Sequence, residues 1–157
     1  MKKIKYQDLS KIEKSLLLEA EGMLEKSYNP YSHFAVGAAI LTSDNQMIGG
    51  ANVENAAYGS CLCAERSALL RANAMGCRSF LKIAIIARSE KTGTAEATAP
   101  CGSCRQMIYE FAQLAGKDIE IIMANTKKNK IVKAKISELL PMAFGPKDLG
   151  VNLKKFI

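Results

Sequence analysis

The spacing of apolar residues predicts a helix near the start of the chain, over residues 7–26. Apolar side chains recur there every three or four positions, at Leu9, Ile12, Leu16, Leu17, Ala20, Met23 and Leu24. A single apolar stripe at this period is typical of a helix that packs against a core. The Asn29–Pro30 pair that follows indicates a turn.

Beyond this turn, the apolar pattern alternates between strand-like and helix-like segments. Residues 34–53 carry two apolar runs around Ser43-Asp44-Asn45, which predicts a β-hairpin. Further elements are predicted in the following order: a helix at 64–74, a strand at 80–87, a helix at 102–116, a strand at 118–125 and a short helix at 136–144 closed by Pro141.

Strands that alternate with helices after a hairpin predict an α/β fold. The hairpin must be antiparallel, whereas strand–helix–strand units are usually parallel, so we expect a mixed sheet. No internal repeat, low-complexity block or linker divides the sequence. Residues 1–157 are therefore predicted to form a single domain.

The composition is that of an ordinary soluble protein, with 48% hydrophobic and 24% charged residues. No apolar run reaches the length of a membrane span, and no apolar stretch follows the basic start of the chain. We therefore expect a cytoplasmic protein without a membrane partner.

The formal net charge of +7 raises the question of a nucleic-acid partner. The lysines lie mainly at Lys2, Lys3 and Lys5 and in residues 127–135, and no aromatic residues interleave with them. This pattern favours solvated loops and strand edges, where lysine blocks unwanted strand pairing, over a nucleic-acid site.

The cysteine and histidine counts limit the possible chemistry. Five cysteines without a secretory signal argue against a disulfide framework and favour metal binding or redox chemistry. The only histidine, His33, leaves no metalloprotease motif of the His-Glu-x-x-His kind. We interpret His33 as a surface or hydrogen-bonded residue rather than a catalytic base.

Two cysteine clusters open the two longer helices predicted after the hairpin. They lie in "CLCAERSALL", residues 61–70, and in "PCGSC", residues 100–104. Helix N-termini favour thiolates, so Cys63, Cys101 and Cys104 could converge on one cation. Three protein ligands leave a tetrahedral position open, which is typical of catalytic zinc. Glu65 could then exchange protons with a molecule held at that position.

This combination resembles the signature of the zinc deaminases, Cys-x-Glu followed by Pro-Cys-x-x-Cys. Four segments are similar, in order and spacing, to the small homotetrameric cytidine deaminases that act on free nucleosides. They are "YSHFAVGAAI", "ANVENAAYGSCLCAERSALL", "PCGSCRQMIYEF" and "ELLPMAFGPKDL". The resemblance implies a three-layer α/β/α fold with a mixed β-sheet of about five strands. It also implies a Zn²⁺ cofactor and deamination of cytidine and deoxycytidine in pyrimidine salvage.

The resemblance also implies roles for individual residues. Cys63, Cys101 and Cys104 correspond to the zinc ligands, and Glu65 to the proton shuttle. The residues that correspond to substrate contacts are Asn52 and Glu54 for the ribose hydroxyl, Phe34 for the pyrimidine face, the Ala64 backbone for the base and Phe144 for a neighbouring subunit's site.

The sequence departs from the family after Phe144, where two small polar residues are common. Gly145 and Pro146 stand there instead, followed by Lys147. The similarity that implies the Phe144 role therefore does not extend to the residues directly after Phe144.

The charge of the cluster suggests a further hypothesis. Three thiolates and one Zn²⁺ ion together carry a net charge of −1. This negative charge opposes ionisation of a water molecule bound to the zinc ion. A cation that donates hydrogen bonds to the sulfur atoms would offset this charge. Arg66 and Arg105 flank the cluster, and we expect at least one of them to contact a ligand sulfur.

Other interpretations are compatible with the same residues. One is a deaminase of a different substrate, such as a single-stranded polynucleotide or blasticidin S. Another is a structural zinc or redox module in which Cys61 supplies a fourth ligand. The Cys-x-Glu spacing instead selects Cys63, which makes Cys61, like Cys77, a packing residue.

Overall fold

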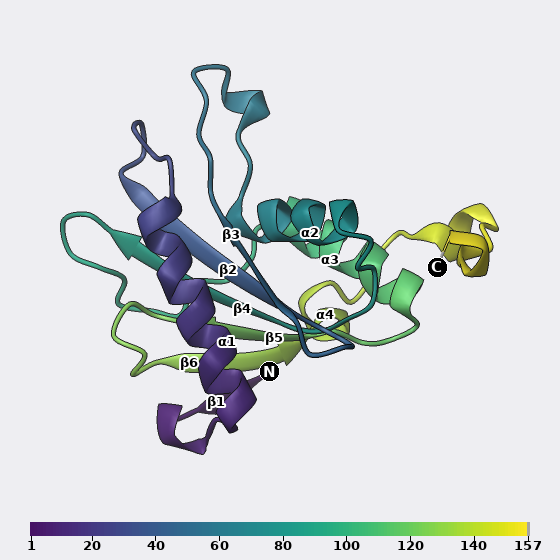
Figure 1. Cartoon of the computed structure of the whole chain (residues 1–157), viewed down its shortest axis with the longest axis horizontal. Helices are drawn as coiled ribbons and strands as arrows, with labels where there is room; N and C mark the ends of the chain where they lie inside the picture. The colour runs from purple at the N-terminus through teal and green to yellow at the C-terminus, as the bar shows by residue number, and fades with distance from the viewer. Residues whose placement is uncertain (157) are drawn as a thin grey trace.

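One mixed β-sheet organises the chain (Figure 1). The computed structural model describes residues 1–156. Within this range the strands are β1 (Lys2–Ile4), β2 (Phe34–Thr42), β3 (Met47–Ala51), β4 (Phe80–Ser89), β5 (Glu120–Ala124) and β6 (Ile131–Lys135). Their order across the sheet is β1-β6-β5-β4-β2-β3. Only β4 and β5 pair in parallel among these described strands, as expected for strands joined by a helical crossover.

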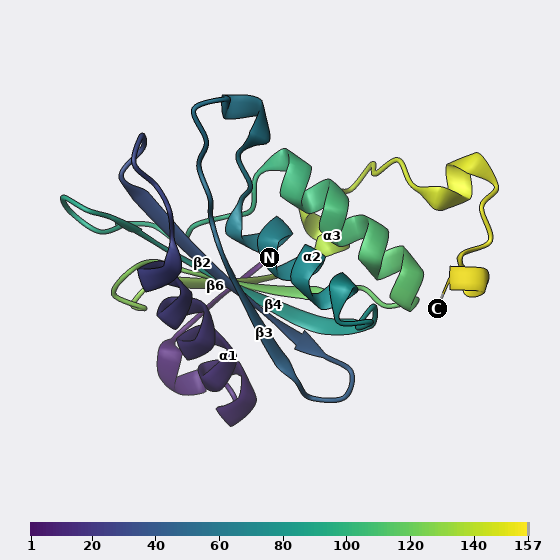
Figure 2. The same cartoon turned by 45° about the horizontal axis from the view of Figure 1, so that its top comes forward.

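Helices cover both faces of the sheet and complete three layers (Figures 1 and 2). They are α1 (Lys11–Gly22), α2 (Ala64–Ala74), α3 (Gly102–Ala115) and the short α4 (Ile136–Leu139). The α1 helix packs Leu16 and Leu17 on one face, whereas α2 and α3 pack Leu69 and Ile108 on the other. This arrangement confirms the predicted α/β/α fold. No helix among the described residues is long and apolar enough to cross a membrane.

The predicted first helix is shorter than residues 7–26. The α1 helix begins after Ser10, whose hydroxyl accepts a hydrogen bond from the Glu13 N–H while the Glu13 carboxylate accepts one from the Ser10 N–H. This reciprocal capping box satisfies two N–H groups at the helix start. Residues 6–8 and 23–26 form 3₁₀ turns instead.

The sheet has six described strands rather than about five, because the lysine-rich segments pair with each other. Residues 127–135 were expected to be loops and strand edges, but β6 lies inside the sheet, between β5 and β1. The Lys133 ammonium lies 2.6 Å from the Glu13 carboxylate. Burial disfavours the ionised form of Glu13 and raises its pKa. Hydrogen bonds from Lys133 and Lys82 outweigh this effect and hold the pKa of Glu13 well below its usual range. Lysines are tolerated in this strand because their ammonium groups have acceptors: the Glu13 carboxylate for Lys133 and the Asp118 carbonyl oxygen for Lys135.

Two glycines allow helices to approach the sheet at backbone distance. A Cβ at Gly37 would lie 2.0 Å from the Ala20 carbonyl oxygen of α1. A Cβ at Gly50, in β3, would lie 2.3 Å from the Ala68 nitrogen and 2.7 Å from the Ala64 oxygen of α2. Because backbone atoms cannot rotate away, the position of α2 depends on the absence of a side chain at Gly50.

We predict that Gly50→Ala destabilises the protein by about 1–3 kcal/mol, since the added methyl group overpacks the contact between β3 and α2. Chemical denaturation would measure the change. Gly22→Ala is the matched control, because a Cβ at Gly22 meets nothing within 4 Å. Equal stability of the Gly50 and Gly22 variants would contradict the proposed packing constraint.

Candidate metal centre and active site

The start of α2 and the start of α3 bring three cysteines together. Cys63 is the N-cap of α2, and Cys101 is the N-cap of α3. Cys104 lies in the first turn of α3 and is fully buried. The two helices lie side by side on one face of the sheet (Figure 2). Residues that are 38 positions apart in the chain therefore meet at one point.

The spacing of the sulfur atoms suits a tetrahedral zinc ion. The Cys63 and Cys101 Sγ atoms are 3.8 Å apart, and those of Cys101 and Cys104 are 3.5 Å apart. All three lie within 4.8 Å of one another. Zn–S bonds of about 2.3 Å at tetrahedral angles place sulfur atoms about 3.8 Å apart. The donor set and its geometry therefore fit Zn²⁺ with three protein ligands and one open position.

Electrostatics favours a thiolate at Cys63. A hydrogen bond from the Cys104 thiol, with further ones from Arg66 and Cys101, lowers the pKa of Cys63 to about 5 against the effect of burial. The same contact with Cys63, together with burial, raises the pKa of Cys104. Without a cation the cluster thus concentrates negative charge on one sulfur. Binding of a cation by three thiolates would release the remaining protons.

Glu65 lies in the first turn of α2, two residues after Cys63. Its side chain is only 3% exposed. Burial raises the pKa of Glu65, and the negative charge of Cys63 adds to this effect. A nearby divalent cation would act in the opposite direction. A buried carboxyl group between these influences is suited to accept and return a proton near neutral pH.

Arg66 contacts the cluster, whereas Arg105 does not. Arg66 Nη2 lies 3.8 Å from Cys63 Sγ and 3.0 Å from the Cys61 carbonyl oxygen. Burial disfavours the charged guanidinium and lowers the pKa of Arg66. The contact with Cys63 outweighs this effect, so the pKa of Arg66 is raised. Arg105 instead donates to the carbonyl oxygens of Pro100 and Leu139. The structure therefore places one of the two arginines against a sulfur atom, as hypothesised, and the other on the backbone.

The remaining cysteines and the histidine lie away from this cluster. Cys61 is half-buried, and its thiol exchanges hydrogen bonds with the Asn55 backbone. Cys77 packs against the core beneath α2 and α3. His33 is exposed, with Nδ1 3.2 Å from a Glu90 carboxylate oxygen. Cys61 is thus occupied with its own loop rather than with the three sulfur atoms.

Asn52 follows β3 and is nearly buried, with its amide group engaged by the fold. Its Oδ1 accepts hydrogen bonds from the Val36 N–H and the Ser27 hydroxyl, at 2.7 and 2.6 Å. Its Nδ2 donates to the Phe34 carbonyl oxygen at 2.9 Å. One Nδ2 hydrogen remains for a ligand. No local pattern points to Ser27, because its contact with Asn52 joins residues 25 positions apart.

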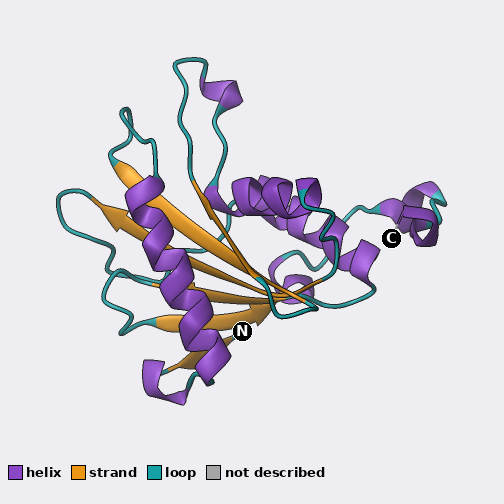
Figure 3. Ribbon diagram, viewed as in Figure 1, coloured by secondary structure: helices purple, strands orange, loops and turns teal. Residues whose placement is uncertain are grey.

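Glu54 holds the neighbouring loop. One carboxylate oxygen accepts hydrogen bonds from the backbone N–H groups of Tyr31 and Ser32. Hydrogen bonding from Ser32 lowers the pKa of Glu54, so this carboxylate stays ionised at neutral pH. The two loops involved, residues 27–33 and 52–63, extend from the same end of the molecule (Figure 3).

A short backbone bridge connects this loop region to the cysteine cluster. Val53 and Leu62 exchange two N–H···O hydrogen bonds of 2.9 Å. Because Leu62 directly precedes Cys63, the bridge fixes Asn52 and Glu54 relative to the metal ligands. Ala64, the next residue, is fully buried, and as the first residue of α2 it has an N–H without an intrahelical partner.

Phe144 lies outside this group of residues, with 61% of its surface exposed. Its carbonyl oxygen accepts a hydrogen bond from Gln106 of α3. A Cβ at Gly145 would lie 2.6 Å from the ring of Tyr109, so the loop packs closely on α3 at this point. Phe144 is therefore held in place by its backbone while its ring faces outward.

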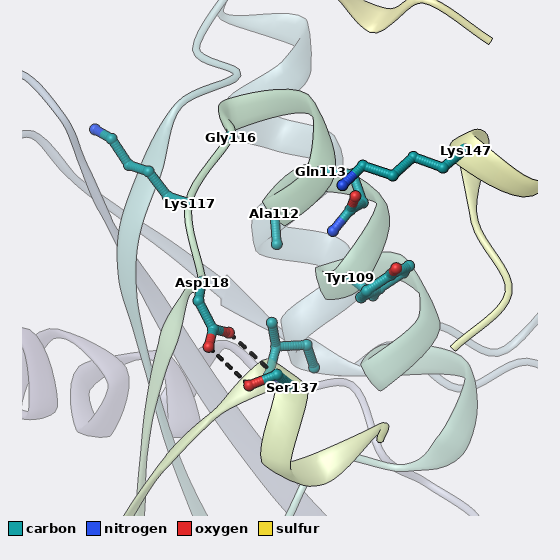
Figure 4. Close-up of a pocket in the computed structure, with 9 residues that line it drawn as sticks. Tyr109, Ala112, Gln113, Gly116, Lys117, Asp118, Ser137 and Lys147 are labelled. Carbon is teal, nitrogen blue, oxygen red and sulfur yellow. Dashed lines mark hydrogen bonds between the residues drawn. The ribbon is translucent and has the colours of Figure 1, made fainter. Parts of the chain in front are cut away.

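The same face of α3 borders a cavity of about 420 Å³ near the helix C-terminus (Figure 4). Lys147 extends toward Gln113 across this cavity, and the Asp118 carboxylate accepts two hydrogen bonds from Ser137. None of the residues predicted to be functional lines it. This cavity is separate from the cysteine cluster.

Comparison with known proteins identifies relatives over most of the chain. Residues 10–115 match the family model described as the cytidine and deoxycytidylate deaminase zinc-binding region. Cytidine deaminase from Halalkalibacterium halodurans is 42% identical over 135 residues, covering 86% of this chain and 96% of the relative. Cytidine deaminase from Sporosarcina psychrophila is 39% identical, covering 86% and 93%. The crystal structure of cytidine deaminase from Burkholderia pseudomallei superposes with a TM-score of 0.75 at 40% identity, covering 83% and 97%.

We predict that Arg66→Gln weakens zinc binding by roughly 10- to 100-fold, because it removes the cation that contacts Cys63. Competition with a chromogenic chelator would measure the affinity. Arg71→Gln is the matched control, since Arg71 lies on the same helix and donates to the Gly49 carbonyl oxygen rather than to sulfur. Unchanged zinc affinity in the Arg66 variant would exclude this role.

Proposed function

Because the chain belongs to the cytidine and deoxycytidylate deaminase family, we propose that it catalyses the zinc-dependent hydrolytic deamination of cytidine and deoxycytidine. The products are uridine and deoxyuridine, and ammonia is released. The observation that carries this proposal is the meeting of three cysteine sulfur atoms at two helix starts, with a buried carboxyl group two residues after one of them.

Zn²⁺, when bound by Cys63, Cys101 and Cys104, supplies a Lewis acid that makes water a nucleophile at neutral pH. Glu65 accepts a proton from this water and delivers it to ring N3 of the pyrimidine. Attack at C4 is thereby favoured, since protonation of N3 withdraws electrons from that carbon. Glu65 then takes the remaining proton from the new hydroxyl group at C4 and passes it to the amino group. The C4–N bond breaks, ammonia leaves, and C4 keeps the oxygen as a carbonyl. The burial of Glu65 keeps its proton exchange directed to the substrate rather than to bulk solvent.

We propose that the nucleoside is oriented by the loops on the other side of the bridge. Asn52, through its remaining Nδ2 hydrogen, and Glu54, through its second carboxylate oxygen, bind the ribose hydroxyl. Phe34 packs against the pyrimidine, and the Ala64 backbone binds the base. The support for this assignment is that Asn52 and Glu54 are polar, held in place and connected by backbone to the residue before Cys63.

We propose a cytoplasmic homotetramer in pyrimidine salvage, with residues 1–157 as one domain, of which residue 157 lies outside the described residues. The outward-facing ring of Phe144 supports a contact with a second copy, which would complete that copy's site. We propose a free nucleoside as the substrate, with neither nucleic acid nor membrane as a partner.

The alternatives differ in ligand set or in substrate. A structural zinc or redox module would use Cys61 as a fourth ligand, yet the Cys61 thiol bonds to Asn55 in its own loop. That contact favours three protein ligands and an open position. Assays of blasticidin S and a cytosine-containing oligonucleotide, beside cytidine and deoxycytidine, would distinguish the substrate classes.

We predict that Glu65→Gln lowers the turnover of cytidine by roughly 10²- to 10⁴-fold, because glutamine cannot accept and return a proton. Release of uridine and ammonia would be followed directly, and zinc content would be measured on the same samples. We expect zinc to be retained, since Glu65 is not a ligand.

Two controls accompany this measurement. The wild-type protein should lose activity on treatment with a zinc chelator and regain it when Zn²⁺ is restored. Glu90→Gln removes an exposed carboxylate whose ion-pair partner among the described residues is His33, and it should leave turnover unchanged. Near-normal turnover by the Glu65 variant would refute the proton-shuttle role, and inactivity of the zinc-loaded wild type on both nucleosides would refute the proposed function.

We predict that Phe144→Ala lowers kcat/KM for cytidine by about tenfold and weakens the assembly, because an exposed aromatic anchor is removed from the proposed interface. Analytical ultracentrifugation and steady-state kinetics would measure the two effects. Met142→Ala is the control, since Met142 is a neighbouring side chain that is 96% exposed. A Phe144 variant with wild-type assembly and kinetics would contradict the intersubunit role.

A further inference from the structure

A groove at the β1 edge of the sheet brings several lysines together over a hollow surface. It encloses about 840 Å³ and is lined by Lys2, Lys3 and Lys5 from the first strand and its continuation, and by Lys130 from the loop before β6. This edge groove is built mostly from residues outside 10–115, the range that matches the family model. It is distinct from the cysteine cluster, since none of Cys63, Cys101 and Cys104 lines it.

The floor of the edge groove is apolar. Lys3 pairs with Val132 across the antiparallel β1–β6 ladder, so their side chains point to the same face of the sheet. Ala97, from the loop after β4, also lines the groove, and both Ala97 and Val132 pack against the core on that face. The helices on this face, α2 and α3, lie toward the other ends of the strands (Figure 1). The edge groove thus combines an apolar floor with cationic walls.

The edge groove keeps a net positive charge of +2, from four lysines and two carboxylates. Lys130 forms an ion pair with Glu96, and Asp8 is the other carboxylate in the lining. The side chains of Lys2, Lys3 and Lys5 make no hydrogen bond or ion pair with the described residues. Protection of an exposed strand edge accounts for lysines along β1 but not for their arrangement around a cavity.

We propose that the edge groove binds the phosphate groups of a nucleoside triphosphate, with the base against the apolar floor. Lysine ammonium groups are point-charge ligands for phosphate, and several of them can contact successive phosphates of one chain. The volume lies within the range of small-molecule sites. A single-stranded nucleic acid is disfavoured, because no aromatic residue among those that line the groove offers a stacking surface.

Isothermal titration calorimetry of the intact protein with ATP, at an ionic strength of about 0.15 M and without magnesium, tests the proposal. ATP is a purine nucleotide, so it reports on the edge groove rather than on a pyrimidine site. We expect ATP to bind, and the double variant Lys3→Gln/Lys5→Gln to weaken its affinity by about tenfold or more. Inorganic triphosphate serves as a second probe: tighter binding of ATP identifies a nucleotide site, and equal affinities identify an inorganic polyphosphate as the source of the phosphates.

The matched control is the double variant Lys26→Gln/Lys155→Gln, which removes the same charge from exposed lysines outside the groove lining. It should change the ATP affinity by less than about twofold, since exposed charges beyond a Debye length are screened. Excess cytidine should leave ATP binding unchanged, which separates the edge groove from the deaminase site.

Four results would overturn the proposal. They are the absence of ATP binding to the wild-type protein, an unaltered affinity in the Lys3/Lys5 variant, an equal loss in the control variant, and displacement of ATP by cytidine. Tighter binding of a single-stranded oligothymidylate than of ATP would also reject it, in favour of a nucleic-acid surface. Thermal denaturation of each variant verifies that the exposed substitutions leave the fold intact.

Discussion

The candidate site depends on backbone-to-backbone packing between a strand and a helix. The α2 helix rests on β3 at Gly50, where there is no room for a side chain. This contact sets the height of Cys63 and Glu65 above the sheet, while the β4–α3–β5 crossover sets the position of Cys101 and Cys104. Because two helices are fixed independently on one rigid surface, three sulfur atoms can meet within 4.8 Å without a disulfide or a local sequence constraint. A helix start is also the place where unpaired N–H groups favour thiolates, so position and electrostatics act in the same direction.

The charge of the site is balanced by neighbours of opposite character. Arg66 donates to Cys63 and offsets part of the negative charge that three thiolates place on a zinc ion. Glu65, one residue before it, is buried and has a raised pKa. Two adjacent residues on α2 thus have opposite roles. Arg66 reduces the electrostatic repulsion among the thiolate ligands, and Glu65 provides a carboxyl group that can carry a proton. Since side chains of adjacent helical residues diverge by about 100°, neither one neutralises the other.

Local patterns predicted most of the elements correctly, because helices 64–74 and 102–116 end at glycines and the buried strands are apolar runs. The cysteine cluster could be predicted as well, since its residues stand at those helix starts. Contacts between residues far apart in the sequence could not be predicted from local patterns. The strand β6 was missed because its lysines look solvated until Glu13 is brought beside Lys133 by the fold. In the same way, no pattern distinguishes Arg66 from Arg105; only the path of the chain decides that one reaches sulfur and the other reaches main-chain carbonyls.

The substrate side of the site is constructed differently from the metal side. Cysteines at helix starts are held by the rigid packing of α2 and α3. Asn52 is held by hydrogen bonds to the β2 backbone and to Ser27, whereas Glu54 is held by two hydrogen bonds to loop backbone. The Val53–Leu62 bridge is the physical link between the two halves, and it consists of only two hydrogen bonds. Loops held by few buried apolar contacts open more readily than the core. It follows that Asn52 stays fixed to the sheet together with the metal half, whereas the loop that Glu54 holds through Tyr31 and Ser32 is the part of the nucleoside half that opens more readily.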